Sequence, residues 1–242
     1  ESLSDWDIEI KQLVSLLVLA TQIKIIRYIR REMPVTKNQK MNKPQNLNHW
    51  LSHFTHIIGI AGSTGSPIVV KEILSMFESG LPICAVIGIH MPAGFTAEFA
   101  KQLNDSTKFN VVEGYDGMKL EIGMAIVAPG NRHIIINNDC TISIRMPGEG
   151  DGYKPSLDIM LESMAKSYGS KSIGVILSGM GNDGCKGVKC IKNSGGIAIA
   201  QSENSSVVYG MAAVCMEEKI IDYILNPEGI GNKINELCKP LD

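Results

Sequence analysis

The sequence predicts an α/β fold: a doubly wound, mostly parallel sheet with helices on both faces and an antiparallel β-hairpin excursion. Two observations support this prediction. Short apolar runs at 56–61, 85–89 and 174–177 alternate with segments of helical periodicity, and such runs are typical of parallel strands covered on both faces. Each run also leads to a polar residue or a glycine-rich turn. In open parallel sheets, ligands bind outside the carboxyl ends of the strands.

The first half of this pattern reads as two strand–helix units. A strand at 56–61 leads into a helix that begins near Pro67, because proline is favoured in the first turn of a helix. Four apolar residues mark the buried stripe of that helix: Val69, Ile73, Leu74 and Phe77. A second strand follows Pro82 and ends before His90, and the helix after it has an apolar stripe at Phe95, Phe99 and Leu103.

Residues 110–145 have a different character, with short β runs at 110–112, 125–128, 133–136 and 141–145. The Asn-Asn-Asp turn at 137–139 predicts a hairpin. We therefore expect this whole region to be the antiparallel excursion.

The pattern then returns to alternation of helices and strands. A helix is expected over 156–167 with Ser156 as its N-cap, because a serine hydroxyl accepts well from the first turn. Two further strands, at 173–178 and 196–200, enclose a helix at 184–194.

Domain organisation follows from composition. An amphipathic helix is expected over about 5–31, where polar residues interrupt the apolar run and leave it too short for a membrane span. Residues 33–48 are polar and contain proline, as linkers do. We predict an N-terminal helix and linker at 1–48 and a compact domain at 49–242. The first residue is Glu1 rather than methionine, which indicates a fragment of a longer protein.

The composition and net charge of the chain are those of an ordinary globular protein. Hydrophobic residues make up 44% and charged residues 20% of the chain, with a net charge of −2. These values give no reason to expect nucleic acid or membrane insertion. The six cysteines form no CxxC pair, so reduced thiols in a cytoplasmic protein are expected.

Ser63 lies in a Gly62-Ser63-Thr64-Gly65 turn between a strand and a helix. There a hydroxyl is exposed, and the N–H groups of the helix start could stabilise an oxyanion. The alternative is a nucleotide-binding module, because Gly59-x-x-Gly62-x-x-Gly65 also matches a dinucleotide fingerprint. Against it, the second strand ends at His90 rather than at an acidic residue that would bind ribose, and no Gly-Lys-Ser/Thr sequence is present.

His90 and Asp183 complete a candidate catalytic set with Ser63. All three follow predicted strands at the same edge of the sheet, as a nucleophile, its base and the orienter of that base would. The alternative role of Asp183 is a helix cap, since a helix is predicted directly after it. His49 and His53 are spaced i, i+4 but have no acidic or cysteine partner nearby, so no metal site is expected.

At these motifs the chain resembles the catalytic domain of the chemotaxis protein-glutamate methylesterases, the CheB family. The matching stretches are GIAGSTG at 59–65, IHMPAGFT at 89–96, APG at 128–130, PSLD at 155–158, LSGMGNDG at 177–184 and AQSENSSVVYGM at 200–211. They occur in the order of the family over roughly residues 56–225. Ser66 departs from a usual glycine and could alter the entrance to the site, and Ile89 departs from a usual polar residue.

The resemblance implies a serine hydrolase with Ser63 as nucleophile, His90 as general base and acid, and Asp183 as orienter. The Met180 backbone N–H and Thr64 would stabilise the oxyanion or position the histidine. The implied reaction removes methyl esters from glutamates of methyl-accepting chemotaxis receptors and releases methanol, with no metal or cofactor. Some relatives also deamidate receptor glutamines.

The resemblance also implies partners. The family usually carries a phosphorylatable receiver domain before the linker, of which residues 1–48 would be the remnant. The alternatives that remain are an esterase or amidase for other acyl substrates, the nucleotide-binding module, and an inactive docking domain. The presence of Ser63, His90 and Asp183 argues against the last of these.

Overall fold

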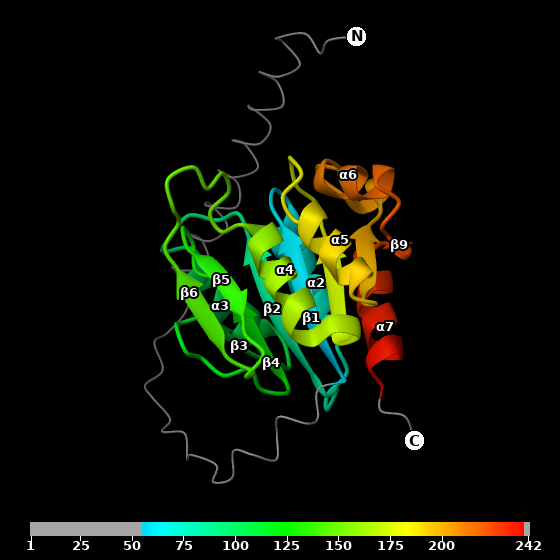
Figure 1. Cartoon of the computed structure of the whole chain (residues 1–242). Coiled ribbons are helices and arrows are strands. Elements are labelled where there is room, and N and C mark those ends of the chain that lie inside the picture. The colour runs from blue at the N-terminus through cyan, green and yellow to red at the C-terminus, as the bar shows by residue number, and fades with distance from the viewer. Residues whose placement is uncertain (1–54, 240–242) are drawn as a thin grey trace, which may run out of the picture. The chain divides into compact units, whose positions relative to one another are not determined.

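In the computed structural model, residues 55–239 are described, and a seven-stranded parallel sheet forms their centre (Figure 1). Its strands, in spatial order, are β3 (Asn110–Glu113), β4 (Met124–Val127), β2 (Ile83–Ile89), β1 (His56–Gly62), β7 (Ser172–Ile176), β8 (Ile197–Gln201) and β9 (Tyr223–Leu225). All neighbouring pairs in this sheet are parallel. The predicted mostly parallel sheet is confirmed.

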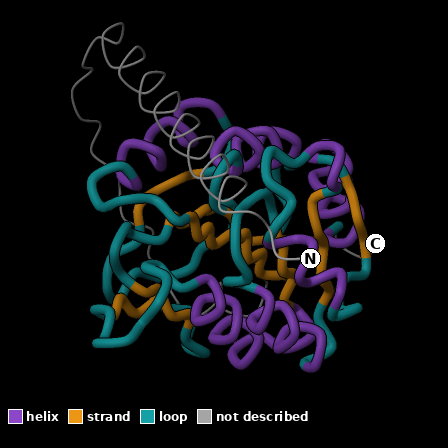
Figure 2. Tube along the Cα trace, turned by 90° about the horizontal axis from the view of Figure 1, so that it is seen from above, coloured by secondary structure: helices purple, strands orange, loops and turns teal. Residues whose placement is uncertain are grey.

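Helices cover both faces of the sheet, as Figure 2 shows in a view from above. One hydrophobic cluster joins the sheet to α2 (Ser66–Met76), α3 (Thr96–Ser106) and α7 (Pro227–Cys238). A second cluster, on the opposite face, includes residues of α4 (Leu157–Tyr168), α5 (Cys185–Asn193) and α6 (Met211–Glu217). The doubly wound arrangement is therefore confirmed as well.

Alternation along the central strand explains why both faces are covered. In β1, Ile58 and Ile60 belong to one cluster, whereas Ile57 and Ala61 belong to the other. Successive side chains of a strand point to opposite faces, so a run of apolar residues needs a hydrophobic layer on each side. The predicted stripe of the first helix is also confirmed, since all four of its residues are buried: Val69, Ile73, Leu74 and Phe77.

The antiparallel excursion is smaller than the sequence predicts. Among residues 55–239, the antiparallel strands are β5 (His133–Ile136) and β6 (Ile142–Arg145), which confirms the hairpin, and one isolated antiparallel bridge joins Lys119 to Thr141. Extending the excursion back to residue 110 was wrong, because β3 and β4 pair in parallel with each other and β4 pairs in parallel with β2. The apolar run of a strand shows that it is extended, but the path of the connection at 114–123 decides its direction.

Several elements were not predicted. They are two short 3₁₀ turns, η2 (Gly169–Lys171) and η3 (Glu203–Ser205), and the C-terminal elements α6, β9 and α7. The start of α7 did have a local signal, because Asn226 caps it by accepting from the Gly229 N–H and Pro227 lies in its first turn. No helix within 55–239 is long and apolar enough for a membrane span.

The chain divides into two units, Glu1–His49 and Trp50–Asp242. The helix predicted at about 5–31, the linker at 33–48, and His49 and His53 all lie outside the described residues. The boundary between 1–48 and 49–242 remains a prediction about domain function.

Candidate active site

The candidate site lies at the carboxyl edge of the sheet where the winding changes direction. From β1 the chain proceeds to β2 on one side, and later returns to β7 on the other side of β1. Such a reversal opens a crevice beyond the strand ends, where ligands of doubly wound proteins bind. Ser63 follows β1, His90 follows β2, and the 177–184 turn follows β7.

Strand register brings Ser63 and His90 to equivalent positions. Gly62 pairs with Ile89 at the last rung between β1 and β2, so each candidate residue is one position beyond that rung. The His90 N–H extends the ladder by donating to the Gly62 carbonyl at 3.2 Å. Neighbouring parallel strands are roughly 5 Å apart, which places the two side chains within reach of one another. Within residues 55–239, no hydrogen bond joins the Ser63 hydroxyl directly to His90.

The backbone around Ser63 is fixed from both sides. Its N–H donates to the Ser178 carbonyl at 2.9 Å, and its carbonyl accepts from the Ser66 hydroxyl at 2.6 Å. Gly65 has φ 85°, a left-handed conformation that favours glycine, and a Cβ there would lie 2.7 Å from Val207. Helix α2 begins immediately afterwards. Ser63 is therefore presented, partly exposed, at the positive end of a helix.

Ser66 does not lie at the entrance, contrary to our expectation from its departure from the family pattern. It is fully buried, and its hydroxyl turns back to the Ser63 carbonyl. The extra side chain thus supports the turn that carries Ser63.

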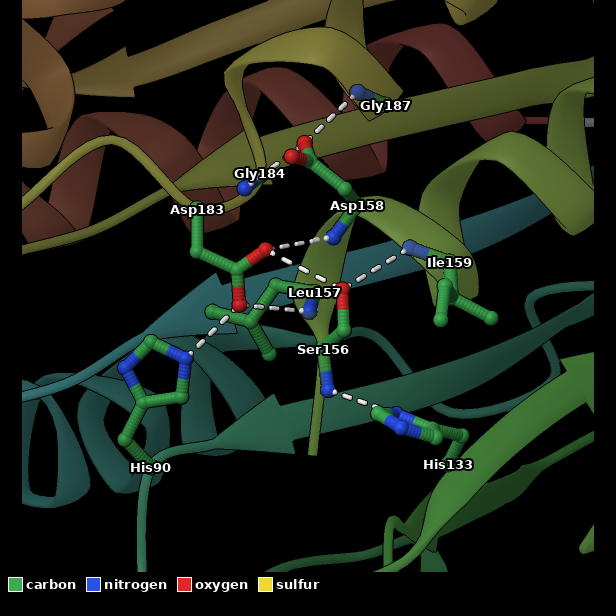
Figure 3. A network of polar contacts seen from close by, with 9 residues as sticks. All are labelled: His90, His133, Ser156, Leu157, Asp158, Ile159, Asp183, Gly184 and Gly187. Carbon is green, nitrogen blue, oxygen red and sulfur yellow. Dashed lines mark hydrogen bonds and ion pairs between the residues drawn. The ribbon is translucent and has the colours of Figure 1, made fainter. Parts of the chain in front are cut away.

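His90 and Asp183 form a hydrogen-bonded pair (Figure 3). The His90 Nε2 and Asp183 Oδ2 atoms are 2.8 Å apart, and their side chains are 16% and 2% exposed. Since an ionised carboxylate only accepts, Nε2 carries the proton and Nδ1 is left as the free base. This is the relation between an orienting carboxylate and a catalytic imidazole.

Asp183 is also bound by the start of helix α4. Its Oδ2 accepts from the Leu157 N–H at 2.8 Å, and its Oδ1 accepts from the Asp158 N–H at 3.0 Å and the Ser156 hydroxyl at 3.3 Å. Burial by itself would raise the pKa of Asp183, but the His90 and backbone hydrogen bonds outweigh it, so the pKa lies below its ordinary value. Asp183 is therefore a buried carboxylate that remains ionised.

The sequence also suggested that Asp183 caps the helix that follows it, and this is wrong because Asp183 binds a different helix. The residue at the N-cap of α5 is Gly184, and no side chain caps that position. Asp183 instead binds the first turn of α4, which is distant in sequence. Capping and the hydrogen bond to His90 coexist in this one carboxylate, so they are not competing explanations.

Met180 and Thr64 carry the two candidate oxyanion N–H groups, and their role stays a prediction. A Cβ on Gly179 would lie 2.8 Å from the Ser63 Cβ, so the backbone just before Met180 packs against the serine. In the part of the chain that the structure describes, neither the Met180 nor the Thr64 N–H donates to another backbone carbonyl outside helices and strands. Both donors are therefore available to an oxyanion near Ser63.

Sequence reasoning missed a polar network behind the serine. The Ser178 hydroxyl donates to the Thr64 carbonyl at 2.8 Å and accepts from the Val208 N–H at 2.9 Å, while the Ser178 N–H donates to Gln201 Oε1 at 2.9 Å. Ser178 and Gln201 are both buried. Polar residues at the ends of otherwise apolar runs were the available signal, because buried polar groups require partners.

Tyr153 was also missed. Its ring stacks on the His90 imidazole, with 4.8 Å between the centroids and 10° between the planes. The loop sequence before Pro155 has no periodicity that would indicate this contact.

The remaining predictions for this region concern nucleotides, metals and thiols. His90 occupies the position where a dinucleotide site needs a carboxylate, and it is engaged by Asp183. Among residues 55–239 there is no group of three or more side chains suited to hold a metal ion. All six cysteines are free, and five of them are buried.

Comparison with known proteins shows the family of this chain. A family model described as CheB methylesterase matches residues 58–234. A protein-glutamate methylesterase/protein-glutamine glutaminase of Lawsonia intracellularis is 34% identical over 229 residues, which are 89% of this chain and 64% of that protein. One of Geobacter sulfurreducens is 37% identical over 75% of this chain and 52% of its own length.

A solved structure is similar as well. The CheB methylesterase catalytic domain of Thermotoga maritima matches with a TM-score of 0.72 and 34% identity, covering 75% of this chain and 98% of that structure. The chain thus spans about half to two thirds of the curated relatives but nearly all of the solved catalytic domain.

Proposed function

This chain belongs to the CheB methylesterase family, and on that premise we propose that it is a protein-glutamate methylesterase. It hydrolyses γ-glutamyl methyl esters on chemotaxis receptors and releases methanol. The observation that carries the proposal is the 2.8 Å hydrogen bond between His90 and Asp183, at the strand ends where β1 presents Ser63. A nucleotide-binding loop does not require a histidine–aspartate pair beside it.

The chemistry proceeds in two steps. The Ser63 hydroxyl attacks the ester carbonyl while His90 Nδ1 takes its proton, and the resulting imidazolium gives that proton to the departing methoxide, which leaves as methanol. Water then attacks the acyl-enzyme with His90 again as base, regenerating Ser63 and leaving a free glutamate. Asp183 holds the reactive tautomer and stabilises the imidazolium in both steps.

The oxyanion of each tetrahedral intermediate is assigned to the Met180 N–H, with Thr64 as a second contributor. The packing of Gly179, the residue before Met180, against Ser63 supports this role, as does the position of Thr64 next to Ser63 in the chain. Donors fixed in place before the reaction stabilise a developing charge without reorganisation.

Glutamine deamidation is a second candidate activity, favoured by the relatives named protein-glutamate methylesterase/protein-glutamine glutaminase. The same acyl-enzyme would form, with ammonia instead of methanol leaving after protonation by His90. The two activities differ only in the leaving group, so one site can carry out both.

The partners follow from the substrate. We assign the substrate to the signalling helices of methyl-accepting chemotaxis receptors, and hence the enzyme to the cytoplasm. Residues 49–242 would be the catalytic domain, and 1–48 the helix and linker that connect it to a phosphorylatable receiver domain. The greater length of the curated relatives supports the presence of a further domain.

The test is methanol release from methylated chemoreceptor membranes, measured for this chain and for its Ser63→Ala variant. Release that is lost in the variant supports a serine-dependent receptor methylesterase. Absence of release from the unaltered chain, with a relative active on the same membranes, would contradict the proposal. Ammonia release from receptors with glutamine at the same positions tests the second activity in parallel.

The nucleotide-binding alternative has its own test. A ligand that binds the native state raises the melting temperature. We expect NAD and ATP to leave the melting temperature of the chain unchanged, and a rise with either would favour the alternative.

A further inference from the structure

A second histidine–aspartate pair lies behind the candidate active site. His133 is fully buried, and its Nε2 is 3.0 Å from Asp151 Oδ2. On the other side of the ring, Nδ1 accepts from the Ser156 N–H at 3.0 Å (Figure 3). A nitrogen that accepts from a backbone N–H carries no proton, so the ring is the neutral tautomer that donates from Nε2 to Asp151. Both nitrogens of His133 are thus used within the fold.

One side of His133 fixes the group that binds Asp183. Ser156 is the N-cap of α4, and its hydroxyl donates to Asp183 Oδ1 at 3.3 Å. The next two N–H groups, of Leu157 and Asp158, also donate to Asp183. His133 therefore holds the first of three consecutive residues that surround the carboxylate.

The other side of His133 fixes the loop that contacts His90. Asp151 accepts from His133 and also from the Gly148 N–H at 2.7 Å, and these bonds lower its pKa, the Gly148 bond most of all. The loop at 146–155 that Asp151 anchors carries Tyr153, whose ring stacks on His90. Exposed Arg145 reaches the same carboxylate only at 3.5 Å.

We propose that His133 is a positioning residue for the His90–Asp183 pair. It acts on Asp183 through Ser156, and on His90 through Asp151 and the stacked Tyr153. The inference rests on the proposed function for its kinetic consequence, but the hydrogen bonds that it predicts can be measured without turnover.

Substitutions at His133 can separate its bond to Ser156 from its bond to Asp151. In His133→Asn the amide oxygen takes the place of Nδ1 and accepts from Ser156, but the side chain is too short to reach Asp151. In His133→Gln the amide nitrogen takes the place of Nε2 and donates to Asp151, while the bond to Ser156 is lost. His133→Leu retains the volume and loses both bonds.

The expected kinetic result is a fall in kcat for methanol release with little change in KM. Small displacements of catalytic groups cost up to about 100-fold, so we expect the largest loss in His133→Leu and smaller losses in the Asn and Gln variants. Asp151→Ala removes the same bond as His133→Asn, and therefore the double variant should be no slower than the slower single one. Arg145→Ala is the matched control, with expected turnover close to that of the unaltered chain.

A spectroscopic readout separates positioning from general destabilisation. The Nε2 proton of His90, bonded to Asp183, should give a downfield proton resonance, assigned by its loss in His90→Gln. We expect this resonance to weaken or shift in His133→Gln and His133→Leu, which lose the Ser156 bond, at temperatures well below their melting transitions. If His133→Leu does not fold, His133→Gln and Asp151→Ala carry the test.

The outcomes of the two proposals are distinguishable. No methanol release from the unaltered chain, with an intact His90 resonance that responds to His133→Gln, would reject the activity and retain the positioning role. Folded His133 and Asp151 variants with unaltered kcat and an unaltered resonance would overturn the positioning role alone. An equal loss of kcat in Arg145→Ala and Asp151→Ala would also overturn it, because the contact between Arg145 and Asp151, and not the bond to His133, would then be responsible.

Discussion

Asp183 binds the start of α4, the helix that contains Asp158, and Asp158 binds the start of α5, the helix that follows Asp183. Asp183 accepts from the N–H of Asp158 in the first turn of α4, at 3.0 Å. Asp158 in turn accepts from the Gly184 and Gly187 N–H groups at the start of α5, both at 2.9 Å. Negative charges are favoured at helix N-termini. The exchange therefore joins two helices of one face and fixes the carboxylate that contacts His90.

Replacing Asp183 by asparagine should abolish most turnover. An amide at this position can donate to His90 and so favours the wrong imidazole tautomer, which by analogy with serine proteases costs on the order of 10⁴ in kcat. The amide nitrogen that replaces Oδ2 also faces the Leu157 N–H, so that two donors meet there without an acceptor. We expect a loss of about 1–3 kcal/mol in the free energy of unfolding. Steady-state methanol release and urea denaturation of the same sample measure the two effects, and a change in stability with normal kcat would leave Asp183 as a structural cap only.

Acid should remove the stabilisation that the ionised Asp183 provides. Its pKa is lowered on folding, so the stabilisation is complete above the unfolded value of about 3.9 and is lost as the pH falls through the lower folded value. The difference in unfolding free energy between the unaltered chain and Asp183→Asn should therefore shrink below about pH 4. Urea midpoints between pH 7 and pH 2.5 test this, and a difference that grows on acidification would contradict it.

Asp158 should behave in the opposite sense. Burial, chiefly, and the nearby charge of Asp183 raise its pKa despite the bonds from Gly187 and Gly184. Its ionisation is therefore less favourable in the folded state, so stability falls as the pH rises from the unfolded value through the folded one. Asp158→Asn retains an oxygen acceptor without the charge, so we expect it to leave the free energy of unfolding at pH 7 nearly unchanged. Asp158→Ala leaves two N–H groups unpaired and should lose about 1–3 kcal/mol in chemical denaturation.

The close contact between α4 and α5 should not tolerate a methyl group at Gly187. A Cβ there would lie 2.5 Å from the Leu161 Cβ and 3.0 Å from the Asp158 carbonyl oxygen. Gly187→Ala should lower the free energy of unfolding by about 1–3 kcal/mol through overpacking. Gly152→Ala is the matched control, since no atom lies within 4 Å of its added Cβ. Equal melting temperatures for the two variants would show that the helices can separate without cost.

The Ser178 hydroxyl should matter for both stability and turnover. Ser178→Ala leaves the Thr64 carbonyl and the Val208 N–H without the partner that connects the serine turn to the 206–209 segment. We expect a loss of about 1–3 kcal/mol and a lower kcat, because Ser63 and its neighbouring N–H groups lose support. Calorimetry and methanol release test this, and Ser143→Ala serves as a control for loss of a hydroxyl away from this turn. Unchanged kcat in a destabilised Ser178→Ala would restrict the network to stability.

The sequence predicted most of the central sheet because its strands are continuous apolar runs. Such runs identify β1, β2 and β7 whatever lies beside them. It placed β3 and β4 as strands but assigned them wrongly to the antiparallel excursion, because their short runs resemble those of the hairpin. It did not predict the C-terminal elements α6, β9 and α7. Pairing direction depends on where a connection leads, and that is a property of the whole chain.

The sequence proposed the three members of the candidate site, whose catalytic roles stay a prediction, but it did not predict the contacts that support them. Ser63, His90 and Asp183 each follow a recognisable apolar run, so the sequence places them at one edge of the sheet. The supporting contacts join residues tens of positions apart in the chain. They are the bonds from α4 to Asp183, the stacking of Tyr153 on His90 and the bond from Ser156 to His133. No local pattern encodes such contacts.

The sequence by itself determined the family, the fold class and the three residues proposed for catalysis, because periodicity and strand-end motifs are local properties of the chain. Only the tertiary structure decided which nitrogen of His90 faces Asp183, that Asp183 and Asp158 exchange helix caps, and that a second histidine–aspartate pair supports the first. The physical reason is that hydrogen-bond geometry depends on relative positions fixed to within an ångström. Packing of α4 against α5 and the sheet sets those positions, after each element has formed from its own pattern.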